Sequence, residues 1–140
     1  MRPVRTCCAI IVLLPVLGGC GGTDRPGVVG SDPSAVTYAQ VQDAIFTPSC
    51  AVSGCHVAGS APFGLDLSTG QSLANIVGVP SAEVPAYERI DPFNPADSYL
   101  YMKVTGDPRI LGDQMPALAP PLSGPKIRLL ESWIEQGANP

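Results

Sequence analysis

The feature that most constrains this chain is the stretch 49–59, SCAVSGCHVAG, which brings together two cysteines and the only histidine of the sequence. Four residues separate Cys50 from Cys55, and His56 follows the second cysteine directly. At about 100° per residue, the two cysteines would lie roughly 140° apart on a straight helix. Any group that both cysteines hold therefore requires the segment to leave regular helical geometry. Ser53 and Gly54 supply the flexibility for such a bulge.

The composition predicts a small, loop-rich domain. The chain has 15 glycines and 16 prolines in 140 residues, so many of its residues must form turns and loops. Hydrophobic residues still make up 45 %, which is too many for a disordered chain. The length suits one domain. Small domains with many loops often need a disulfide, a metal or a cofactor to be stable.

The first twenty residues predict a targeting segment. Arg2 and Arg5 provide positive charge ahead of the apolar run 10–17, which is too short to span a bilayer. The run leads into LGGC at 17–20. This sequence resembles the lipobox of bacterial lipoproteins, in which the chain is cleaved before a cysteine that receives lipid. We therefore expect Cys20 to be lipidated; an ordinary signal peptide that ends near a cysteine is the alternative.

These signals divide the chain into three parts. We expect a lipoprotein signal peptide over 1–19, the lipidated cysteine with a flexible tether over 20–36, and a folded domain over 37–140. The lipid would anchor the protein to the outer or the cytoplasmic membrane of the cell envelope. The domain would then lie in the periplasm or at the cell surface. These compartments are oxidising, and a pair of free thiols would not normally persist there.

The charge of the processed chain limits its partners. Loss of Arg2 and Arg5 with the signal peptide leaves 6 basic residues against 12 acidic ones, a net charge of −6. Such a chain is a poor partner for nucleic acid. It would favour a protein partner with a basic docking face, although simple solubility explains the charge equally well.

The hydrophobic spacing predicts an all-α domain of four short helices with long loops and no strand. Possible capping boxes pair Thr37 with Gln40 and Ser68 with Gln71. The first helix should stop before Pro48, because proline disfavours helical geometry in the residue before it. The predicted helices span about 37–47, 68–77, 94–105 and 123–136.

Three kinds of chemistry fit the cysteines and the histidine. Covalent attachment of haem needs two cysteines for the two vinyl groups and a histidine after the second, and Cys-x-x-Cys-His is the usual signature. Here the spacer has four residues, while Cys55 and His56 keep their usual relation. A disulfide between Cys50 and Cys55, with the histidine incidental, is an alternative. Zinc is the third, but its fourth ligand would still have to be found.

The order of features along 37–140 resembles a class I c-type cytochrome. A helix runs into the Cys…Cys-His stretch, a loop and short helices follow, Met115-Pro116 stands in a late loop, and an amphipathic helix closes the chain. Within that last helix, ESWIEQGA at 131–138 is similar to the end of the final helix in many bacterial cytochrome domains. The resemblance implies a small cytochrome c-like fold of about four short helices and long loops around one haem c.

The same resemblance assigns the residues of the site. It implies covalent attachment of haem through Cys50 and Cys55, with His56 as the proximal and Met115 as the distal iron ligand. A backbone carbonyl in the loop after the histidine should accept a hydrogen bond from its ring, and we favour Pro62 for this role. Arg89 and Lys103 are candidates for pairing with a haem propionate, although ordinary surface charge is the preferred interpretation of both.

The function implied is transfer of single electrons between other redox proteins by a lipid-anchored domain. Ligation by histidine and methionine favours a fairly positive reduction potential. The sequence shows no evident general base, nucleophile or open metal position, so we do not expect an enzyme. The alternative from another class is a disulfide-stapled lipoprotein that has a structural or partner-binding role and carries no haem.

Overall fold

The computed structural model describes residues 34–140. The predicted signal peptide, Cys20 and most of the tether lie outside the described residues, so the processing and lipidation of this chain stay predictions. Among residues 34–140, none of the helices has both the length and the apolar character that a membrane span requires.

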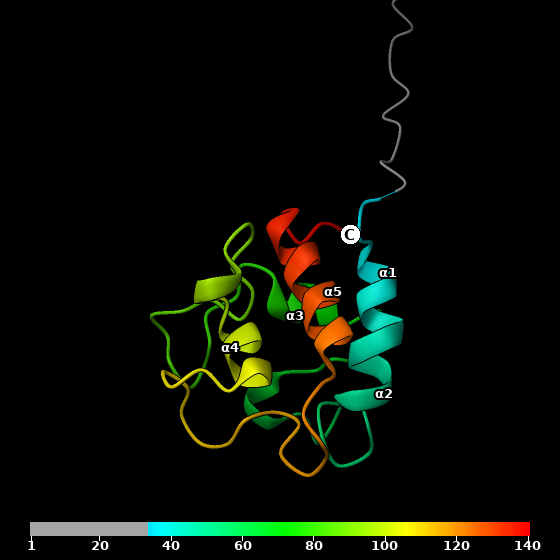
Figure 1. The fold of residues 1–140 in the computed structure, drawn as a ribbon. Coiled ribbons are helices and arrows are strands. Elements are labelled where there is room, and N and C mark those ends of the chain that lie inside the picture. The colour runs from blue at the N-terminus through cyan, green and yellow to red at the C-terminus, as the bar shows by residue number, and fades with distance from the viewer. Residues whose placement is uncertain (1–33) are drawn as a thin grey trace, which may run out of the picture. The chain divides into compact units, whose positions relative to one another are not determined.

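The described part of the chain is helical, which confirms the predicted all-α class (Figure 1). Its β structure is limited to two isolated bridges, Val77 with Ile90 and Pro80 with Glu88. The helical elements are α1 (Tyr38–Val41), η1 (Gln42–Phe46), α2 (Thr47–Ser49), η2 (Pro62–Gly64), α3 (Ser72–Ile76), η3 (Pro95–Asp97), α4 (Tyr99–Thr105) and α5 (Gly124–Glu135). Long loops join them, and several of these loops, together with α4, line the site described below.

Local signals set several helix ends as predicted. The capping box at the start of α1 is formed: the Thr37 amide donates to Gln40 Oε1 at 2.9 Å, and the Gln40 amide donates to Thr37 Oγ1 at 3.3 Å. Gly106 ends α4 in the left-handed conformation, with φ of 75°. Ser123 precedes α5, and Pro125 lies in its first turn.

The prediction that the first helix stops before Pro48 was wrong. Elements α1, η1 and α2 form one continuous helical run that contains Pro48 and ends at Ser49. The η1 turn is π-helical, and the amide of Thr47 bonds to the carbonyl of Gln42, five residues back. This wider turn changes the hydrogen-bond register immediately before the proline, which lacks an amide hydrogen, so the run can continue through it.

The predicted capping box of the second helix does not form. Helix α3 begins at Ser72, after Gln71, and has no side-chain cap. In a capping box the amide of Ser68 would donate to the Gln71 side chain, but here it donates to Asp66 Oδ1 at 2.9 Å. The competing local turn therefore delays the start of the helix.

The third predicted helix is divided into η3 and α4 by Ser98, which has an extended conformation with ψ of 111°. Its buried hydroxyl accepts from the Asp91 amide at 2.8 Å and donates to the Asn94 carbonyl at 2.9 Å. These bonds offer the backbone an alternative to the helical ladder.

The core forms where α5 packs between α1 and α4 (Figure 1). Trp133 of α5 is its largest buried side chain, and its ring lies 5.9 Å from that of Tyr38 in α1. The indole Nε1 donates to the Asn139 carbonyl at 2.8 Å, so its only polar atom is satisfied. The buried apolar cluster consists of Val41, Ile45, Phe46, Leu67, Ile76, Ile90, Leu100, Val104, Leu130, Trp133, Ile134 and Ala138.

Candidate functional site

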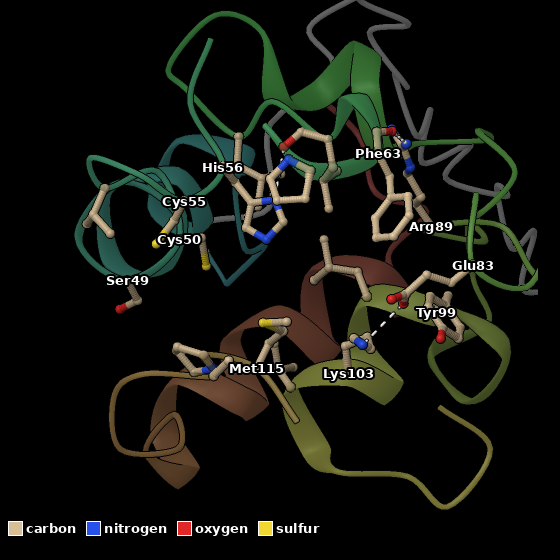
Figure 2. A pocket seen from close by; sticks show the side chains of 18 of the residues that line it. Ser49, Cys50, Cys55, His56, Phe63, Glu83, Arg89, Tyr99, Lys103 and Met115 are labelled. Carbon is tan, nitrogen blue, oxygen red and sulfur yellow. Dashed lines mark hydrogen bonds and ion pairs between the residues drawn. The ribbon is translucent and has the colours of Figure 1, made fainter. Parts of the chain in front are cut away.

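A largely apolar cavity of about 340 Å³ lies between the loop after α2 and the loop before α5. All four residues predicted for the domain's site line it: Cys50, Cys55, His56 and Met115. Figure 2 shows the two sulfur atoms of the cysteines at one end of the cavity, with His56 and Met115 on opposing walls. The volume falls in the range of about 300–1,000 Å³ that is usual for small-molecule and cofactor sites.

The four-residue spacer forms the expected bulge. The helical run ends at Ser49, and Cys50 has a non-helical conformation, with φ of −125° and ψ of −48°. Gly54 has φ of 81°, a conformation that favours glycine. The Cys55 amide then donates to the Val52 carbonyl at 2.9 Å, which closes a turn inside the spacer. The bulge is completed by the His56 amide, which donates back to the Cys50 carbonyl at 3.1 Å.

The imidazole of His56 is oriented by the backbone of the next loop. Its Nδ1 lies 3.1 Å from the Leu65 carbonyl oxygen. A carbonyl can only accept, so Nδ1 carries the proton, and a neutral ring then has its lone pair on Nε2. Burial lowers the pKa of His56 below its ordinary value; the Leu65 hydrogen bond opposes this effect, and the nearby positive charge of Arg89 adds to it. The ring is therefore neutral at pH 7 and can ligate a metal.

The prediction that Pro62 supplies this carbonyl was wrong. Pro62 begins the η2 turn, in which its carbonyl accepts from the Leu65 amide at 3.0 Å. That turn uses the Pro62 oxygen and presents the Leu65 oxygen to the histidine instead.

Cys50 and Cys55 are both free, partly buried thiols. Burial raises the pKa of the Cys50 thiol to about 11, although the positive charge of Lys126 opposes the shift. The thiol is therefore protonated at neutral pH. Within residues 34–140, no group of three or more His, Cys, Asp or Glu side chains is arranged to hold a metal ion.

The loop that carries Met115 is tied to α4. The Met115 amide donates to the Lys103 carbonyl at 2.8 Å, and Gln114 Nε2 donates to the Val104 carbonyl at 2.9 Å. These bonds satisfy carbonyls near the end of the helix and hold the methionine at the cavity wall. Met102 is 1 % exposed in α4 and lies outside the cavity lining, as expected for a core methionine.

Two cations line the cavity, and the interpretation of both as surface charge was wrong. Arg89 and Lys103 are 9 % and 8 % exposed. Arg89 donates to two backbone carbonyls, whereas Lys103 Nζ pairs with Glu83 Oε2 at 3.1 Å and donates to the Leu111 carbonyl at 2.7 Å (Figure 2). Arg89 and Glu83 come from the irregular stretch 79–93, where no periodic pattern reveals burial.

A scan of protein-family models, a search of curated proteins and a search of solved structures each found no match to this chain. The functional interpretation of the cavity therefore depends on its own residues and their geometry.

Proposed function

We propose that the domain is a c-type cytochrome, which holds one covalently bound haem c in this cavity and transfers single electrons between redox proteins. The observation that carries the proposal is the pairing of a neutral imidazole with a thioether on opposing walls, beside two cysteines (Figure 2). Haem would supply an iron that changes between the ferric and ferrous states.

The lining suits such a group. Cys50 and Cys55 would hold it covalently, His56 would be the proximal ligand and Met115 the distal one. The apolar surface between them favours a porphyrin. The cysteines stand at one end of the cavity and the cationic side chain of Arg89 at the other, which suits a ligand with acidic groups at one edge (Figure 2).

In this proposal, backbone hydrogen bonds within the chain hold the two iron ligands in position. Leu65 holds the ring of His56 in the tautomer that leaves Nε2 available. The backbone of α4 holds the loop of Met115. Both ligand positions are then taken by protein side chains, and this arrangement serves electron transfer rather than substrate binding. We therefore propose a redox carrier and not an enzyme.

The disulfide alternative explains less of the site. A staple between Cys50 and Cys55 gives no role to the oriented ring of His56 or to Met115 across the cavity. The cellular setting we propose is the one that the sequence suggests: a lipid anchor at Cys20, a domain in the periplasm or at the cell surface, and redox partners with basic docking faces.

Replacing Met115 with alanine should open the sixth iron position. The weak far-red sulfur-to-iron band of the ferric protein should vanish, and the reduction potential should fall, because a thioether stabilises ferrous iron. Visible spectroscopy and a redox titration of protein made in a host with cytochrome maturation would measure both.

The matched control is Met102→Leu, a volume-conserving change of a core methionine outside the cavity. It should leave the far-red band in place. A band that survives Met115→Ala and disappears in Met102→Leu would reverse the ligand assignment. A parent protein with no such band would exclude methionine as the sixth ligand.

Replacing Cys20 with serine should release the protein from the membrane, because the acyl chains of the anchor would have no attachment site. Fractionation of cells that express the parent and the Cys20→Ser protein would show this. If the variant stays with membranes as firmly as the parent, the anchor lies elsewhere in the chain.

A further inference from the structure

We propose that Gln42 is a positioning residue for His56, which acts through the loop segment 63–67. The inference rests on the proposed function, because the side chain that Gln42 would position is the iron ligand. Gln42 lies in η1 and does not line the cavity, so its effect on the site must pass through other residues.

The segment 63–67 holds the histidine at two points. Its Leu65 carbonyl accepts from Nδ1 of the His56 ring at 3.1 Å. Its Leu67 amide donates to the backbone carbonyl of His56 at 2.9 Å. The position of the imidazole therefore depends on the position of this short stretch of backbone.

Gln42 fixes one end of the segment. Its side-chain Nε2 donates to the Leu67 carbonyl at 3.1 Å and to Thr47 Oγ1 at 3.0 Å. Its Oε1 lies 2.9 Å from the Tyr38 hydroxyl and 2.5 Å from Ser72 Oγ, and these two hydroxyls also hydrogen-bond to each other. The residue is 2 % exposed, both N–H donors of its amide are used, and the two hydroxyls supply at least one hydrogen bond to its oxygen. The amide can therefore take one orientation, with its nitrogen toward Leu67.

The other end of the segment is held by Arg89. Its Nη2 donates to the Phe63 carbonyl at 2.8 Å, and its Nη1 donates to the Asn75 carbonyl at 2.8 Å. Buried side chains thus hold the segment on both sides of Leu65. Arg89 lines the cavity and would also act by its charge, whereas Gln42 is neutral and outside the lining. Gln42 therefore gives the cleaner test.

Gln42 is connected to both parts of the proposed attachment motif, the cysteines and the histidine. The helical run that contains it ends at Ser49, immediately before Cys50, while its side chain reaches the segment that holds His56. The carbonyl of Gln42 accepts from the Thr47 amide in the π-helical turn. Such turns are frequent at functional sites.

Loss of the Gln42 amide should change the iron ligand and not only the stability. A histidine ligand that donates Nδ1–H to a carbonyl is more basic and better oriented. Without Gln42 to hold Leu67, the Leu65 carbonyl can move away and the ring can turn. A less basic ligand stabilises ferric iron less, so the reduction potential should rise.

The test uses the full-length holoprotein with Gln42→Met, which keeps an unbranched side chain of similar length and removes the amide. We expect an upward shift in reduction potential in a redox titration. We also expect a changed pattern of haem methyl shifts in the proton NMR spectrum of the ferric protein, because these shifts depend on the orientation of the axial imidazole plane.

Ser98→Ala is the matched control. Ser98 is fully buried and makes several hydrogen bonds, but none of them reaches the segment 63–67. It should lower stability without changing the potential or the methyl shifts. If Gln42→Met does not fold, Ser72→Ala replaces it, because it removes one partner of Gln42 Oε1 and should shift the same signals in the same direction by less.

The outcomes separate the two proposals. A parent protein without covalent haem overturns the proposed function and this inference with it. A parent with haem whose potential and methyl shifts are unchanged by Gln42→Met, or by Ser72→Ala where that variant replaces it, overturns the positioning role alone. A change of equal size in Ser98→Ala also overturns it, because the effect would then come from general loss of buried hydrogen bonds.

Discussion

Protein in which Cys50 and Cys55 are both replaced by alanine should carry no covalent haem. The parent, made in a host with cytochrome maturation, should keep its haem stain on a denaturing gel, because thioether bonds survive unfolding. The double variant has no cysteine sulfur in the cavity to which haem could be attached, so its polypeptide band should lose the stain completely. Mass spectrometry should agree: apart from the mass change of the two substitutions, the double variant should be lighter than the parent by the mass of one haem.

The Cys20→Ser protein is a suitable control, because it loses a cysteine outside the domain and should keep its haem. One result would favour the alternative function: a mature parent whose mass is only polypeptide plus lipid, with Cys50 joined to Cys55 by a disulfide. That result would remove the cytochrome proposal, since both sulfur atoms would then be used.

Replacement of Trp133 by alanine should be the most destabilising single change in the core. The side chain is 1 % exposed and packs between α5 and α1 against Tyr38. Large-to-small changes at such positions cost about 3–5 kcal/mol, because apolar contact is lost and a cavity remains. This is a large part of the stability of a small domain. Chemical denaturation of the parent and the variant would measure the difference.

Trp133→Phe is the matched control. It keeps an aromatic ring in the core and removes the indole N–H, which donates to the Asn139 carbonyl at 2.8 Å. Its cost should be clearly smaller than that of alanine. If Trp133→Ala lowers the free energy of unfolding by less than about 1 kcal/mol, the described packing of α5 against α1 is wrong.

Features that depend on neighbouring residues could be predicted from the sequence. The capping box of Thr37 and Gln40, the left-handed end of α4 at Gly106 and the start of α5 after Ser123 all follow from local backbone chemistry. The bulge between Cys50 and Cys55 belongs to the same class, because its hydrogen bonds close within a few residues.

Predictions from local patterns were wrong where another nearby residue formed hydrogen bonds that replaced the expected ones. The Ser68 amide binds Asp66 instead of Gln71, and the Ser98 hydroxyl interrupts a helix that the spacing favoured. Pro48 is tolerated because a π-helical turn precedes it. Each outcome depends on which of two hydrogen-bonding patterns is lower in free energy, and composition does not reveal this.

The sequence by itself determined the helical class, most helix ends and the set of side chains that could form a site. Tertiary structure decided how that set is arranged: it placed Met115 opposite His56, chose Leu65 to hold the ring, and buried Arg89 beside the cavity. It also brought Gln42 to Leu67, 25 residues along the chain. The physical reason is that helix signals act through bonds between near neighbours. A cavity wall is formed by loops that meet only after the core has packed, and no spacing rule relates such loops in sequence.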